Sequence, residues 1–149
     1  MPQLSGIQVA LRQSPGQELE NNAIIFFDSP INQIGTGITY SKDTLTEKYT
    51  GIFTISQSGH YRVDWWATID GTAATVGIML ALNVGDSVGE RVHSRAAAPP
   101  VTSQVSGSAL VTVDDAPVNL FITNISEKLI TFEDEIDVQA NIVIVELPS

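Results

Sequence analysis

The chain has 149 residues, of which 43% are hydrophobic and 16% charged; this is enough for one domain with a substantial core and too short for two full-sized domains. Seven basic and seventeen acidic residues give a formal net charge of −10, which argues against nucleic acid or an anionic membrane as a partner. The absence of cysteine excludes disulfides, thiol catalysis and zinc–thiolate sites. No apolar run approaches the roughly 20 residues of a membrane span, so we expect no membrane insertion.

Short strand-like runs separated by turn residues follow one another along the chain, which predicts an all-β sandwich or barrel of about ten strands. We expect residues 1–149 to form a single domain, with 1–5 as a flexible lead-in. Residues 23–27 form a further short apolar run, and residues 96–100, with two prolines, are predicted to be a stiff loop. The clearest predicted strands are residues 6–13, 52–56, 60–70, 75–83, 88–95, 104–113, 118–124 and 136–147.

The segment 60–70 has the strongest period of two. Tyr61, Val63 and alternate residues up to Ile69 are predicted to face the core. The opposite side carries a base, an acid and Trp66, which buries on the order of 200 Å² when covered. We therefore interpret this side as an interface between subunits. One side of the last predicted strand, 136–147, changes from polar to apolar along its length, as though another subunit covers part of it as well. The predicted interface residues are Arg62, Asp64, Trp66, Asn141, Val143 and Val145.

Residues 50–63 carry the pattern T-G-x-F-x-I-x-x-x-G-x-Y-x-V, formed by Thr50, Gly51, Phe53, Ile55, Gly59, Tyr61 and Val63. This pattern resembles the signature of the C1q/TNF-like family, and the segments 105–115, 118–122 and 140–147 resemble later strands of that family. The chain departs from the family at Ala116, at Ala140 and Asn141, and at Trp65, where the family has phenylalanine.

The resemblance implies a ten-stranded jelly-roll sandwich of two antiparallel sheets that assembles as a homotrimer without a cofactor. The low lysine content and the lack of cysteine resemble the C-terminal domain of BclA-like collagen-like glycoproteins of the bacterial spore exosporium. The expected function is then a non-enzymatic, extracellular trimeric head of a spore-surface filament, which drives trimerisation and presents loops for adhesion to a surface glycan or a host protein.

Two alternatives remain. The chain could be the receptor- or glycan-binding tip of a phage or bacterial fibre, with Tyr40, Arg91, His93 and Arg95 as the candidate ligand-binding residues. It could also be an enzyme, but neither a nucleophile motif nor a spaced carboxylate pair supports catalysis.

Acidic residues are concentrated between 114 and 137. Most such clusters are solvated loops, and no EF-hand spacing is present, but a Ca²⁺ site is the alternative because calcium takes six to eight oxygen ligands. The candidate ligands are Asp114, Asp115, Glu133, Asp134 and Glu135. Asn124-Ile125-Ser126 fits the N-glycosylation pattern, but we interpret it as a turn at the end of a strand.

Overall fold

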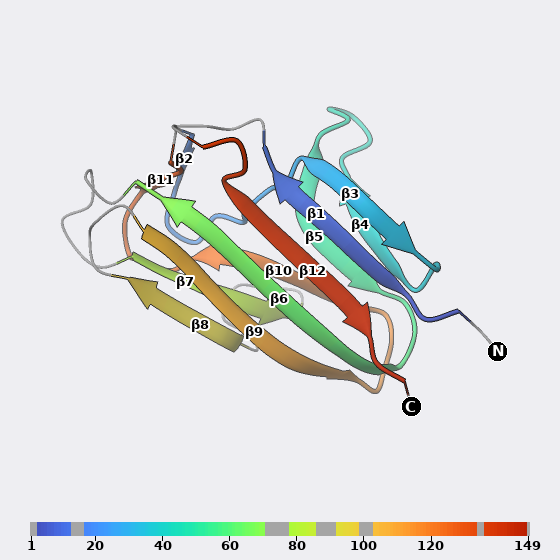
Figure 1. Cartoon of the computed structure of the whole chain (residues 1–149). Coiled ribbons are helices and arrows are strands. Elements are labelled where there is room, and N and C mark those ends of the chain that lie inside the picture. Colours follow the sequence, from blue (N-terminus) through green and yellow to red (C-terminus); the bar gives the residue numbers. More distant parts are fainter. Residues whose placement is uncertain are drawn as a thin grey trace.

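Two five-stranded antiparallel sheets lie face to face in the computed structural model, which describes residues 3–12, 17–70, 78–85, 92–98, 103–133 and 136–148 (Figure 1). The first sheet has the spatial order 3-1-12-6-9 and consists of β1 (Gly6–Leu11), β3 (Ser29–Ile34), β6 (Gly59–Ile69), β9 (Ser103–Val113) and β12 (Ala140–Glu146). The second has the order 4-5-10-7-8 and consists of β4 (Ile38–Lys42), β5 (Tyr49–Ile55), β7 (Ile78–Val84), β8 (Val92–Ala98) and β10 (Val118–Asn124).

These ten strands confirm the predicted all-β jelly-roll sandwich, and two short strands add to it. The short strands, β2 (Glu18–Leu19) and β11 (Ile130–Thr131), pair only with each other. The described residues include no helix long and apolar enough to cross a membrane.

The prediction of a loop at residues 96–98 is wrong. These three alanines continue β8 and pair with the start of β7, in the register Leu80↔Ala96 to Ile78↔Ala98. The prolines that suggested a loop begin only at Pro99, so the three alanines keep their N–H groups and can join the ladder.

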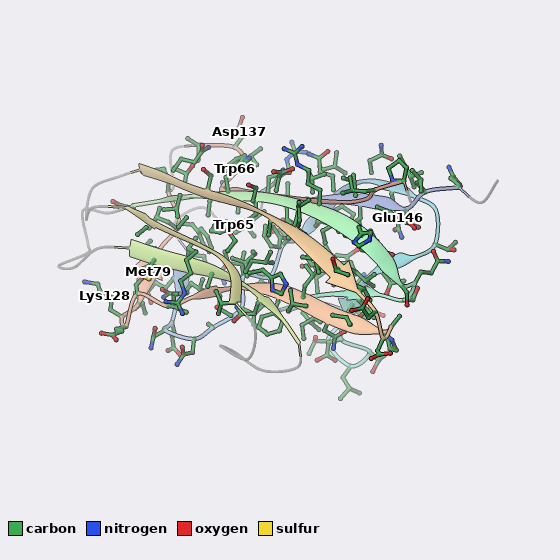
Figure 2. The ribbon with its side chains drawn as sticks, turned by 90° about the horizontal axis from the view of Figure 1, so that it is seen from below. Trp65, Trp66, Met79, Lys128, Asp137 and Glu146 are labelled. Carbon is green, nitrogen blue, oxygen red and sulfur yellow. The ribbon has the colours of Figure 1, made fainter. Side chains whose placement is uncertain are left out.

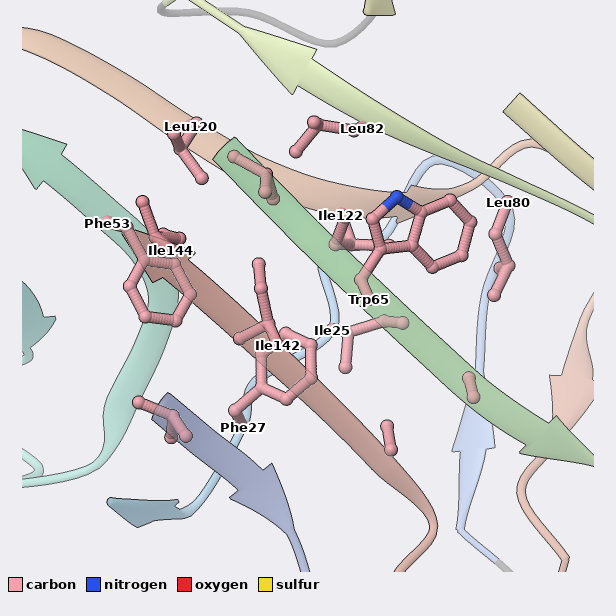
Figure 3. Close-up of a cluster of buried hydrophobic side chains, with 14 of the residues drawn as sticks. Ile25, Phe27, Phe53, Trp65, Leu80, Leu82, Leu120, Ile122, Ile142 and Ile144 are labelled. Carbon is pink, nitrogen blue, oxygen red and sulfur yellow. The ribbon is translucent and has the colours of Figure 1, made fainter. Parts of the chain in front are cut away.

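The core lies between the sheets and follows the predicted alternation. On β6, the five alternate side chains from Tyr61 to Ile69 are at most 2% exposed. Figure 3 shows Trp65 among the aliphatic side chains of the facing sheet, close to Leu80 and Ile122. A period of two along an eleven-residue strand thus fixes which side of β6 belongs to the core and leaves the other side for contacts outside it.

The residues of the C1q/TNF-like signature have structural roles. Phe53, Ile55, Tyr61 and Val63 are completely buried. Gly51 has a φ of +85°, and a side chain there would collide with the carbonyl oxygen of Ile25. The pattern therefore specifies packing of β5 and β6 and not a binding site.

The two ends of the chain lie together. The Ser5 N–H donates to Oε1 of Glu146 at 2.9 Å, and the Gly37 N–H donates to Oγ of Ser5 at 2.8 Å. Ser5 is only 4% exposed, so this residue of the predicted lead-in belongs to the folded domain.

Candidate interaction surface

The outer side of the first sheet carries the predicted interface residues. Because β6 pairs with β12, Arg62 lies opposite Val145, Asp64 opposite Val143, and Trp66 opposite Asn141. The structure therefore brings all six predicted residues into one patch of three adjacent cross-strand pairs. Figure 2 shows Trp65 between the sheets and Trp66 on the opposite side of β6.

The neighbouring strands extend this patch in both directions through residues that the sequence did not single out. On one side, β9 places Ser106, Ser108 and Leu110 beside β6. On the other side, β1 and β3 continue the same rows. We call the whole surface the central face, formed by Gly6, Gln8, Ala10, Asn32, Ile34, Arg62, Asp64, Trp66, Ser106, Ser108, Leu110, Asn141, Val143 and Val145.

Two pairs of polar side chains on the central face contact each other. Nε of Arg62 lies 3.0 Å from Oδ2 of Asp64, with the two side chains 60% and 44% exposed. Nε2 of Gln8 donates to Oδ1 of Asn141 at 3.0 Å. Arg62 and Asp64 are the only charged members of the face, so it is formally neutral although the chain carries −10.

The central face is hollowed at three places. A hollow of about 450 Å³ lies over β6 and β9, beside Asp64 and Trp66. A second, of about 300 Å³, lies at the border of the face and is lined by Trp66, Ile31, Val138 and the charged Arg12. A third, of about 140 Å³, lies over β1 and β3, between Ile34 and Val145. An uneven surface of this kind, without net charge among its defining residues, can interlock with another protein surface.

The predicted ligand-binding residues are not brought together. Tyr40 lies on β4, whereas His93 and Arg95 lie on β8, and these strands are the opposite edges of the second sheet. Arg91 lies outside the described residues. His93 and Arg95 are both exposed on β8, so they remain candidates for a ligand site there.

Tyr40 is built into the protein's own packing. Its ring stacks on Phe53 at 4.2 Å and on Tyr49 at 4.8 Å between centroids, and its hydroxyl donates to the carbonyl oxygen of Phe27 at 2.6 Å. Burial raises the pKa of the Tyr40 phenol well above its usual range, and the charge of Asp28 contributes in the same direction. Both ring faces and the hydroxyl are occupied, and this leaves little of Tyr40 for a ligand.

The candidate calcium ligands are also separated. Asp114 and Asp115 follow β9, and the carbonyl oxygen of Asp114 accepts a hydrogen bond from Ser58, just before β6 begins. The Glu133 N–H donates to the carbonyl oxygen of Thr68, near the other end of β6. Asp134 and Glu135 lie outside the described residues. Within the described ranges, no group of three or more His, Cys, Asp or Glu side chains could hold a metal ion.

The fold is a TNF/C1q-like jelly roll. No protein-family model and no curated protein matches the sequence. Among solved structures, Eiger TNF from S. frugiperda matches with a TM-score of 0.71 at 15% identity, covering 100% of this chain and 95% of that chain. The PRD1 vertex protein P5 matches with a TM-score of 0.60 at 16% identity, covering 97% of each chain. The globular domain of zebrafish complement 1qA matches with a TM-score of 0.56 at 15% identity, covering 95% of this chain and 94% of that chain. At these identities the likeness establishes the fold alone.

Proposed function

We propose that this chain is the non-enzymatic globular head of a trimeric surface filament, with the central face as its subunit interface. The observation that carries this proposal is the neutrality of the central face in a chain of charge −10. Copies of an acidic protein repel one another over most of their surface, and they can approach closely only where acidic groups are absent or paired.

The side chains of this face fit an interface that excludes water. Trp66 and Val143 are half-buried within one protomer, so each keeps apolar area that a partner could cover. Obligate interfaces commonly bury 2,000 Å² or more and resemble a core cut in half. Burial of this face would also stabilise a fold that contains no disulfide.

We place this head on the bacterial spore exosporium, at the end of a collagen-like filament, where a trimer would set the register of three stalk chains. Three identical copies of each loop would then act together, and multivalency raises avidity without one strong site. The resemblance of the sequence to the exosporium glycoproteins supports this location.

A phage or bacterial fibre tip is the second candidate, and the likeness to the PRD1 vertex protein P5 favours it. This function predicts binding to a polysaccharide that weakens when the exposed His93 and Arg95 are replaced by alanine. A purely structural head would show no such binding.

The oligomeric state tests the proposal directly. Light scattering on a sizing column should give three times the chain mass of 16.0 kDa. Ser108→Arg adds a charge at an exposed position of the central face and should yield folded monomer, and Trp66→Asp should abolish the trimer or the soluble protein. Thr39→Arg is the matched control, because Thr39 is exposed on β4 of the other sheet. A monomeric wild-type chain, or a trimer that tolerates both changes on the central face, would contradict the proposal.

A further inference from the structure

Leu110 is the most exposed large apolar side chain of the central face. It lies on β9, an edge strand of the first sheet, and is 72% exposed, whereas the next residue, Val111, is 1% exposed on the core side. The alternation of β9 thus directs a leucine outward at the edge of the central face, whereas the other members of the face on β9 are serines.

A hollow of matching chemistry lies on the far side of the same face. It has a volume of about 140 Å³ and is lined mainly by aliphatic and small side chains, among them Gly6, Ile34 and Val145. A Cβ at Gly6 would lie 3.4 Å from Cγ1 of Val145, an ordinary van der Waals contact, so a larger residue here would occupy part of the hollow. A cavity of about 150 Å³ accommodates benzene, so this hollow is large enough for the end of a leucine side chain.

Leu110 cannot reach the hollow of its own protomer. The strand registers place Leu110, Arg62, Val145, Gly6 and Ile34 in one row across the sheet, in that order. Strands lie about 4.8 Å apart, so Leu110 and Gly6 are separated by about 14 Å, with the Arg62 side chain between them. A Leu110 side chain that fills the hollow must therefore belong to another molecule.

We propose that Leu110 of one copy packs into the Gly6 hollow of the next copy, and that this contact closes the ring of three. This inference rests on the proposed function. Three sheets that face a common axis meet at their edges, so the β9 edge of one copy lies against the β1–β3 edge of the next. The contact joins two different patches, as a ring requires, and each copy uses both of them.

A second copy is the occupant that the charges favour. Leu110, the hollow and the intervening Arg62 all belong to the central face, whose defining residues carry no net charge. The charge of Arg62 is neutralised within the protomer, because its Nε lies 3.0 Å from Oδ2 of Asp64. When Arg62 is buried together with Asp64, the large free-energy cost of burying an unpaired charge is avoided. Contact between two copies of this chain therefore requires no charged group from a different protein.

The lack of cysteine makes disulfide trapping a clean test. In the variant Leu110→Cys/Ile34→Cys, oxidation should convert most chains into a covalent trimer on non-reducing gels, and a reductant should return it to monomer. An internal disulfide is excluded, because the two positions lie about 19 Å apart across four strand spacings and a disulfide needs Cα atoms within roughly 7 Å. Leu110→Cys/Val145→Cys is the second variant, on the other rim of the hollow.

Each single-cysteine variant should remain uncross-linked, because the contact joins unlike positions. Light scattering of the reduced proteins separates the possible failures. A trimer in which neither double variant cross-links would overturn the Leu110 contact and leave the proposed function intact. A monomeric wild-type chain would overturn both, and a covalent product that stops at the dimer would overturn the ring.

Discussion

Gly107 of β9 provides the space that the indole ring of Trp65 on β6 occupies. The two residues are direct cross-strand partners. A Cβ on Gly107 would lie 2.6 Å from Cζ2 of Trp65 and 2.6 Å from Oγ of Ser94 on β8. Trp65 is 2% exposed and is enclosed by the core, so its ring cannot move aside. The absence of a side chain at Gly107 therefore determines how closely β6, β8 and β9 pack.

The change Gly107→Ala should destabilise the fold by about 1–3 kcal/mol, because an added methyl group in a filled core forces side chains or backbone to shift. Urea unfolding followed by tryptophan fluorescence, at matched protein concentration, measures the change in midpoint. Thr39→Ala is the control, since Thr39 is exposed on β4 and lies outside the central face. Equal midpoints for the two variants would show that the core has room that the structure does not indicate.

The indole N–H of Trp65 gives a second prediction. Among the described residues, Nε1 of Trp65 is a buried polar atom with no hydrogen-bond partner. An unpaired buried donor costs about 1–3 kcal/mol, which offsets part of the apolar area that the larger ring buries. Trp65→Phe, which restores the residue type of the C1q/TNF-like pattern, should therefore change the free energy of unfolding by less than about 1 kcal/mol. Trp65→Ala should lose about 3–5 kcal/mol in the same urea experiment.

Asn124 holds a junction between β10 and β11. Its side chain is fully buried, and Nδ2 donates to the carbonyl oxygens of Leu19 at 3.0 Å and Lys128 at 2.7 Å. Oδ1 accepts the Ser126 N–H at 2.9 Å. The Asn-Ile-Ser sequence is thus a structural turn, in agreement with its interpretation as the end of a strand.

Asn124→Ala should cost about 2–4 kcal/mol, because it leaves several buried backbone groups without partners. Thermal unfolding of this variant should be compared with that of Thr39→Ala, an exposed change on β4 that should have almost no effect. A loss below about 0.5 kcal/mol at Asn124 would mean that water replaces these hydrogen bonds.

The parts of the fold that could be predicted from the sequence are those in which apolar and polar residues alternate along a single strand. The strand β6 and the orientation of Trp66 follow from a period of two within eleven residues. The exposed polar strand β3 gave no such signal, because none of its side chains reaches the core. The pairing of β1 with β12 was hidden for a different reason: the hydrogen-bonded side chains of Gln8 and Asn141, which join the two strands, are 133 residues apart, and no local pattern links them.

The same distinction explains the outcome for the candidate sites. The six predicted interface residues could be identified because they alternate with core residues on two recognisable strands, and the structure pairs them across β6 and β12. Tyr40 looked available because a tyrosine in a polar segment often faces solvent. Its stacking on Phe53 depends on the pairing of β4 with β5, which aligns the two residues, and on the position of the Phe27 carbonyl.

Tyr40 and Tyr61 should make the protein unstable in alkali. Burial raises the pKa of both phenols above their ordinary value of 10.0, and at Tyr61 the charge of Glu146 adds to the effect. Above pH 10 the unfolded chain loses phenolic protons that the folded chain retains. Because the folded state then binds more protons, the free energy of unfolding falls as pH rises, by up to about 1.4 kcal/mol per pH unit for each tyrosine.

This decline should begin near pH 10 and continue until the raised pKa of each folded phenol is reached. Tyr40→Phe and Tyr61→Phe each lose one hydrogen bond, to Phe27 at 2.6 Å and to Gln57 at 2.7 Å, which should cost about 1 kcal/mol at neutral pH. Each variant should also have a shallower decline above pH 10, and the double variant the shallowest. Urea unfolding between pH 8 and 11.5 measures these slopes. Parallel slopes for the wild type and the double variant would show that both phenols ionise in the folded protein as readily as in the unfolded chain.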